Sequence, residues 1–153
     1  MEIFDSHAHY DASAFREDRG EVLASLPSRG VCGVINCGSH LESCRASVEL
    51  ARRYPYVYAA VGLHPEDLKD APADWLHQVE EMLAEPKVVA VGEIGLDYYW
   101  KENAPREEQK AALAAQLELA NAHGLPIVFH DREAHGDTME LLRKYRPRGV
   151  LHC

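Results

Sequence analysis

Histidines and one glutamate follow several short apolar runs along this chain. Imidazole and carboxylate groups together suit Zn, Mn, Fe or Co, and they tolerate Mg when water fills the remaining positions. One His-x-His pair is weak evidence, because nine histidines in 153 residues give roughly half such a pair by chance. The whole set is more specific, and it predicts a divalent-metal site. The candidate ligands are His7, His9, Glu93, His130 and His152, and His64 follows a further strand at the same rim.

The segment FDSHAHYD places His7 and His9 two positions apart on an extended stretch. Their side chains then point to the same side, with Cα atoms roughly 6 to 7 Å apart, so both imidazoles can close on one ion. Glu93 adds a carboxylate that can bind one metal or bridge two. His130 and His152 are candidates for holding a second ion.

Each of these residues also has a simpler interpretation. A histidine at a strand end is often a cap or a packed, hydrogen-bonded group. Glu93 could accept hydrogen bonds in the turn 92–95, and His64 with Pro65 could shape a loop. A rim of imidazoles around one carboxylate has no evident packing purpose, however, and this favours the metal site.

Composition fits one soluble globular domain over residues 1–153. The hydrophobic fraction is 46% and the charged fraction 27%, and no apolar run approaches a membrane span. The start of the chain lacks a basic segment followed by a long apolar one, and no C-x-x-C pair occurs among the four cysteines. We therefore expect a cytoplasmic protein with reduced thiols. The net charge of −9 argues against nucleic-acid binding through a broad basic surface, but bound metal could supply positive charge to a phosphate.

Apolar runs alternate with helical stretches along the whole chain. The expected strands are EIFDSH at the start, 31–37, 57–63, 88–92, 125–129 and RGVLHC at the end. The expected helices are 21–30, 40–53, 74–85, 105–123 and 137–145. Ser39 with Glu42 is typical of a capping box, Pro105 suits a first helical turn, and Gly124 suits a helix end.

An alternating β-α order predicts a parallel sheet covered by helices, either doubly wound or closed into a barrel. The strands lack strict alternation of polar and apolar residues, as is usual for strands buried on both faces. The first strand is followed by DSHAHYD and not by the glycine-rich turn of a dinucleotide site. Polar residues instead follow many different strands, which favours a TIM-like barrel with the site at the strand ends.

Two further positions could contact a substrate. The loop GLDYYWK carries Tyr98 and neighbouring aromatic rings that could stack on nucleobases, or that could pin the loop by apolar contacts. Arg132 lies close enough to His130 to bind a phosphate in the same cleft. An ion pair of Arg132 with Asp131 or Glu133 is the alternative.

The sequence resembles the TatD family of metal-dependent deoxyribonucleases. The matching stretches are FDSHAHYD, VGLHP, VGEIGLDYY, GLPIVFHDREA and GVLHC, in family order over the whole chain. The resemblance implies a TIM-like barrel and 3′-5′ exonuclease-type hydrolysis of DNA ends. It implies His7, His9, Glu93, His130 and His152 as ligands of two divalent ions (Mg, Mn or Zn), with His64 in the phosphate pocket and in the catalytic set with Glu93.

The chain is shorter than a complete barrel. Eight β-α units take about 250 residues, and 153 residues provide about six strands and five helices. We therefore expect the N-terminal part of a TatD-like barrel without its C-terminal part. The family's later aspartate has no counterpart here, so we expect low or absent nuclease activity from this chain alone. Open edges on the first and last strands favour self-association.

Three functions follow from these observations. The first is an in-line phosphodiester hydrolase in which two ions hold the phosphate and activate water, while His64, Arg132 and the Tyr98 loop contact single-stranded DNA. The second is an amidohydrolase that cleaves amide or C–N bonds. Those enzymes often have a carboxylated lysine after strand 4, where this chain has Glu93. The third is an inactive, self-associating, metal-binding fragment.

Overall fold

A computed structural model describes residues 2–152, which form one parallel six-stranded sheet in the order β1-β2-β3-β4-β5-β6. The strands are β1 (Ile3–Ala8), β2 (Val31–Cys37), β3 (Val57–Val61), β4 (Val88–Asp97), β5 (Ile127–Arg132) and β6 (Gly149–His152). The helices are α1 (Arg19–Ser25), α2 (Leu41–Arg53), α3 (Trp75–Met82), α4 (Arg106–Ala122) and α5 (His135–Tyr145). Short 3-10 helices span Ser13–Phe15, Pro27–Arg29 and Leu68–Asp70. The predicted β-α order is confirmed.

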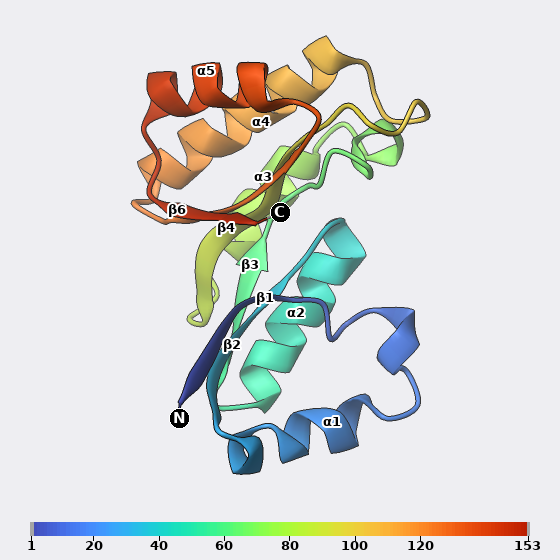
Figure 1. The fold of residues 1–153 in the computed structure, drawn as a ribbon, viewed down its shortest axis with the longest axis vertical. Coiled ribbons are helices and arrows are strands. Elements are labelled where there is room, and N and C mark those ends of the chain that lie inside the picture. The colour runs from blue at the N-terminus through green and yellow to red at the C-terminus, as the bar shows by residue number, and fades with distance from the viewer. Residues whose placement is uncertain (1, 153) are drawn as a thin grey trace.

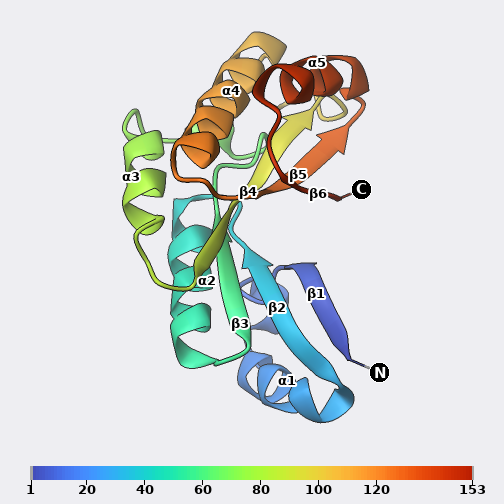
Figure 2. The ribbon, with the colours of Figure 1, turned by 90° about the vertical axis from the view of Figure 1, so that its left-hand side faces the viewer.

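The sheet is curved, with its helices on the outside (Figure 1). Figure 2 shows β1 and β6 toward the same side of the molecule, away from α2 and α3. The main core lies between sheet and helices, and Phe129, Ile94 and Leu117 are among its largest fully buried side chains. This arrangement is an incomplete TIM-like barrel, as the sequence predicted.

The predicted capping box ahead of α2 is wrong. His40 is the N-cap, and its imidazole Nδ1 accepts a hydrogen bond from the Ser43 amide at 3.3 Å. Ser39 lies one residue too early, and its carbonyl instead accepts a hydrogen bond from the His64 amide at 2.8 Å. Ser39 therefore links the exits of β2 and β3 and does not begin the helix.

The expected ends of α4 agree closely with the structure. Pro105 precedes the first helical residue, where its missing amide hydrogen costs no helical bond. Gly124 follows the helix with φ of 65°, a left-handed conformation that glycine adopts without strain. The chain thus turns sharply between the end of α4 and the start of β5.

Strands β4 and β5 are longer than the apolar runs that predicted them. Pairing of the two strands continues through Ile94 with Phe129, Gly95 with His130, and Asp97 with Arg132. Glu93 and His130 consequently lie inside strands and not after them. An apolar pattern marks only the part of a strand that faces the core, whereas backbone pairing extends into residues that face the cleft.

The two edge strands are the exposed part of the sheet. Every residue of β4 except Val89 is buried, whereas Phe4 of β1 is 54% exposed and Leu151 of β6 is 55% exposed. Within residues 2–152, β1 pairs only with β2 and β6 only with β5. In the same residues, no helix combines the length and apolar character that a membrane crossing needs.

Candidate metal centre

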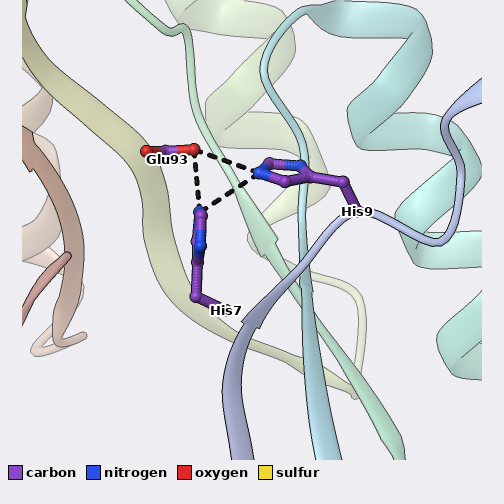
Figure 3. A group of neighbouring side chains, drawn as sticks. All are labelled: His7, His9 and Glu93. Atoms are coloured by element: carbon purple, nitrogen blue, oxygen red, sulfur yellow. Dashed lines mark hydrogen bonds and ion pairs between the residues drawn. The ribbon is translucent and has the colours of Figure 1, made fainter. Parts of the chain in front are cut away.

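Glu93 lies at the centre of the histidine cluster. Its side chain is 5% exposed, and its Oε2 lies 2.9 Å from His7 Nε2 and 3.3 Å from His9 Nε2. The two histidine Nε2 atoms are 3.1 Å apart (Figure 3). These three atoms form a compact triangle of possible metal ligands. His7 belongs to β1, His9 follows β1 directly, and Glu93 belongs to β4.

The other carboxylate oxygen faces a second group of imidazoles. Glu93 Oε1 lies 3.3 Å from His130 Nδ1, 3.7 Å from His152 Nε2 and 3.9 Å from His64 Nε2. The rings of His7 and His152 stack with centroids 3.8 Å apart, so β1 and β6 approach each other here although they do not pair. The structure therefore brings together every residue that the sequence assigned to the metal site.

Hydrogen bonds on the far side of two rings leave ligand nitrogens facing the carboxylate. His9 Nδ1 lies 2.8 Å from the Cys37 carbonyl oxygen, so this nitrogen carries the proton in the neutral ring and donates it. His130 Nε2 likewise lies 3.0 Å from Asp97 Oδ2. In the neutral rings the lone pairs are on His9 Nε2 and His130 Nδ1, the nitrogens that face Glu93, and protonation of either nitrogen turns it into a hydrogen-bond donor to the carboxylate. Such backing of metal-binding histidines by an oxygen acceptor is a common feature of metal sites.

His64 has the opposite arrangement. Its Nδ1 accepts a hydrogen bond from the Glu66 amide at 3.3 Å, which places the proton on Nε2, the nitrogen that faces Glu93. Burial lowers the pKa of His64 to about 4, so the ring is neutral near pH 7. In this tautomer Nε2 is a hydrogen-bond donor toward the cleft and not a metal ligand.

The cluster keeps its central carboxylate ionised. Burial alone would raise the pKa of Glu93, but hydrogen bonds from His130, His7 and His9 outweigh burial and hold the pKa well below its usual range. The hydrogen bond to Glu93 is also the main reason that the pKa of His9 is raised. Burial lowers the pKa of His152, which favours its neutral form. A cation that binds beside Glu93 would displace the protons on His9 and His130, because histidine binds a metal only as the neutral ring.

A buried polar network fixes the segment that carries His9. The Asn36 amide group donates to Asp11 Oδ1 and to Ser47 Oγ, each at 2.8 Å, while its oxygen accepts from the Tyr10 amide. Ser43 Oγ donates to the other oxygen of Asp11 at 2.6 Å. The loop after β1 is thereby tied to β2 and α2, and His9 is held over the end of β2.

Sequence reasoning missed several residues of the site. An open cleft of about 450 Å³ is lined by the cluster and also by Ser39, Glu66 and Asp67. The fully buried Asp97, which supports His130, was missed as well. Asp97 is four residues beyond Glu93 on the same strand. Because side chains of a strand alternate between its two faces, this even spacing was a signal that both residues face the same side. Glu66 and Asp67 lie in a loop, where no period predicts direction.

Of the three predicted substrate residues, His64 lines the cleft, whereas Tyr98 and Arg132 are not among its lining residues. Tyr98 donates its hydroxyl hydrogen to Asp137 at 2.7 Å and stacks under the Arg106 guanidinium, which are the contacts of a residue that pins the loop. Arg132 contacts the rings of Tyr99 and Trp100. Within residues 2–152, no ion pair joins Arg132 to a carboxylate, and Asp131 bonds instead to His135 and Thr138.

The donor set fits divalent metal ions. Two groups place three nitrogen or oxygen atoms within 4.8 Å of one another: His7 with His9 and Glu93, and His64 with His130 and Glu93. In the second group the protonated Nε2 of His64 is not a ligand, and His152 Nε2, 3.7 Å from Glu93 Oε1, takes its place beside His130. Glu93 belongs to both groups and offers a different oxygen to each side, as a bridging carboxylate does. The chemistry of the residues present therefore agrees with a binuclear site, with His152 beside His130 on the second side.

Comparison with known proteins gives the family. The family model described as TatD related DNase matches residues 4–153. The chain belongs to the TatD family. This TatD-family chain is 34% identical over 154 residues to an uncharacterized metal-dependent hydrolase, YabD of Bacillus subtilis, with 99% of the chain and 60% of that protein covered. It is 36% identical over 154 residues to the 3′-5′ ssDNA/RNA exonuclease TatD of Escherichia coli K12, with 99% and 59% covered.

A solved structure shows the same fold. The crystal structure of YjjV, a TatD homologue from Escherichia coli K12, aligns with a TM-score of 0.90 and 34% sequence identity, covering 98% of this chain and 59% of that one. The TatD-family chain thus spans about three fifths of the length of the curated relatives it matches.

Proposed function

We propose that this chain forms the N-terminal part of a divalent-metal-dependent phosphodiesterase that removes nucleotides from single-stranded DNA ends in the 3′-5′ direction. The observation that carries the proposal is the position of the Glu93 carboxylate, whose two oxygens face two separate groups of imidazoles. Relatives named as a metal-dependent hydrolase and as a 3′-5′ ssDNA/RNA exonuclease support the reaction class. The location in the cytoplasm stays a prediction from composition.

Two ions of Mg, Mn or Zn would be held by this cluster. His7, His9 and one oxygen of Glu93 would hold the first, and His130, His152 and the other oxygen would hold the second. When bound, such ions supply Lewis acidity to a phosphate and lower the pKa of water. Asp97 and the Cys37 carbonyl keep the ligand nitrogens of His130 and His9 turned inward.

The remaining residues would act on the substrate. His64 directs an N–H into the cleft and would donate a hydrogen bond to a phosphate oxygen without gaining charge, because its ring is neutral. Arg132 offers a guanidinium with no carboxylate partner in residues 2–152, and such a group suits a phosphate. Tyr98 would hold its own loop in place for the substrate, because its hydroxyl donates a hydrogen bond to Asp137 of α5.

The test combines metal binding with cleavage. We expect calorimetric titration with Mn²⁺ to give two ions per chain, and to lose at least one in the double variant His7→Ala, His9→Ala. Cleavage of a 3′-end-labelled single strand with Mg²⁺ or Mn²⁺ should be low for the chain alone and undetectable in that variant. The double variant His77→Ala, His123→Ala, which removes two histidines outside the cleft, is the matched control. Equal binding and cleavage in the two double variants would refute the metal site.

The exposed edges support a second role, self-association. Ile3 and Phe4 of β1 and Val150 and Leu151 of β6 are each 45% to 55% exposed, and backbone groups on these strands lack a neighbouring strand within residues 2–152. We expect light scattering to show a mass that rises with protein concentration, and Leu151→Lys to lower it. A monomer at every concentration would contradict this role.

A further inference from the structure

Two aromatic side chains and one guanidinium form an exposed cluster beside the cleft. Tyr99 is 49% and Trp100 41% exposed, and their rings meet edge to face with centroids 4.6 Å apart. The Arg132 guanidinium carbon lies 5.0 Å from the Tyr99 ring centroid and 5.8 Å from that of Trp100. Large exposed aromatic rings next to a polar cleft point to a ligand with an aromatic face.

The backbone that presents these rings is firmly held. Asp97 is fully buried, and its Oδ1 accepts hydrogen bonds from the amides of Tyr99 at 3.0 Å and Trp100 at 3.4 Å. The Asp97 carbonyl oxygen accepts further hydrogen bonds from the side chains of Asn103 and Gln109. Tyr98 is anchored to α5 and α4 by Asp137 and Arg106. The loop therefore half-buries Tyr98 as its anchor and leaves the next two rings exposed to solvent.

The cluster is coupled to the metal centre through one carboxylate. The oxygen of Asp97 that does not hold the loop lies 3.0 Å from His130 Nε2. In the sheet, Asp97 pairs with Arg132, and Arg132 is two residues beyond His130, which is roughly 7 Å along a strand. A phosphate held between the two imidazole groups would thus have its attached nucleoside within range of the exposed rings.

We propose that Tyr99, Trp100 and Arg132 form a stacking platform for a terminal nucleobase of single-stranded nucleic acid. This inference rests on the proposed phosphodiesterase function and names the part of the substrate that the loop recognises. Aromatic and guanidinium planes stack on every base, so the platform selects an unpaired base without selecting its sequence. Arg132 also places positive charge at this point of a chain whose net charge is −9, which favours the polyanionic strand.

The experiment separates base stacking from phosphate chemistry. The full chain with Mn²⁺ is titrated with a phosphorothioate-linked single strand, and with the same strand carrying abasic sites at its three 3′-terminal positions. We expect the base-containing strand to bind roughly ten-fold more tightly and to quench tryptophan fluorescence. Trp100→Leu with Tyr99→Leu should abolish this preference, whereas Trp100→Phe should retain most of it. Trp75→Phe, in α3, is the control that removes the other tryptophan.

A second measurement keeps the two proposals distinct. Calorimetric titration with Mn²⁺ should give the same two ions in the parent chain and in Trp100→Leu, because the indole belongs to neither group of proposed ligands. A base-dependent affinity in a chain that binds no Mn²⁺ would support the platform and count against the phosphodiesterase. Equal affinity for the two strands, or no binding of either, would overturn the platform whether or not Mn²⁺ is bound.

Discussion

Glu93→Gln is expected to weaken Mn²⁺ binding by at least 100-fold at both halves of the cluster. Loss of residues that merely orient ligands typically costs 10- to 100-fold in metal affinity, and Glu93 is a shared ligand in our proposal. The amide keeps the size of the carboxylate but removes its charge and one of its acceptor oxygens. Because Oε2 faces His7 and His9 while Oε1 faces His130, one substitution acts on both sides.

Calorimetric titration and circular dichroism measure this prediction. The spectrum should keep its helical content, since the substitution preserves shape, while the binding isotherm flattens. Glu81→Gln removes an exposed carboxylate beside His77 and should bind two ions as the parent chain does. Two ions bound by Glu93→Gln with unchanged affinity would contradict the role of Glu93 as the shared ligand.

Gly95→Ala is expected to lower the free energy of unfolding by about 3 kcal/mol or more. A Cβ at Gly95 would overlap the carbonyl oxygen of His130, and would lie 3.0 Å from the His130 Cα, where β4 and β5 pair. The obstacle is backbone and not a flexible side chain, so it can be relieved only by separating two central strands. The same displacement moves His130 away from Glu93.

Urea denaturation followed by circular dichroism gives the midpoint and the slope for this variant. Gly136→Ala is the matched control, because a Cβ at that position in α5 meets nothing within 4 Å, and alanine favours a helix. We expect its midpoint to equal or slightly exceed that of the parent chain. Coincident midpoints for Gly95→Ala and Gly136→Ala would show that β4 and β5 tolerate the added methyl group.

The fold and the cluster were predictable because both follow from patterns that repeat along the chain. Alternating apolar and helical stretches gave the parallel sheet, and parallel strands bring their carboxyl ends to one rim. His7, His9 and His130 could therefore be placed near Glu93 before any geometry was known. Strand lengths were less accessible, because β4 continues to Asp97 through residues that face the cleft.

Other features depend on contacts between distant segments, which a local pattern does not encode. The proton position on His9 is set by a carbonyl 28 residues away, and that on His130 by Asp97, 33 residues away. Ser39 is a residue type that often caps helices, but His40 is the N-cap of α2, and the Ser39 carbonyl accepts a hydrogen bond from the His64 amide. The orientation of Tyr98 toward Asp137 likewise could not be predicted without knowing where α5 lies.

The stacked rings of His7 and His152 have a thermodynamic consequence. The first and last strands have no hydrogen-bonded ladder between them, yet they meet at these rings. Cations held on the two sides of Glu93 would link β1 to β6 through that one carboxylate, and they would disfavour the unfolded chain, in which the two strands are far apart. Their binding free energy would then add to conformational stability in proportion to the logarithm of ion concentration, so that the metal content of the solution sets the stability of the curved sheet.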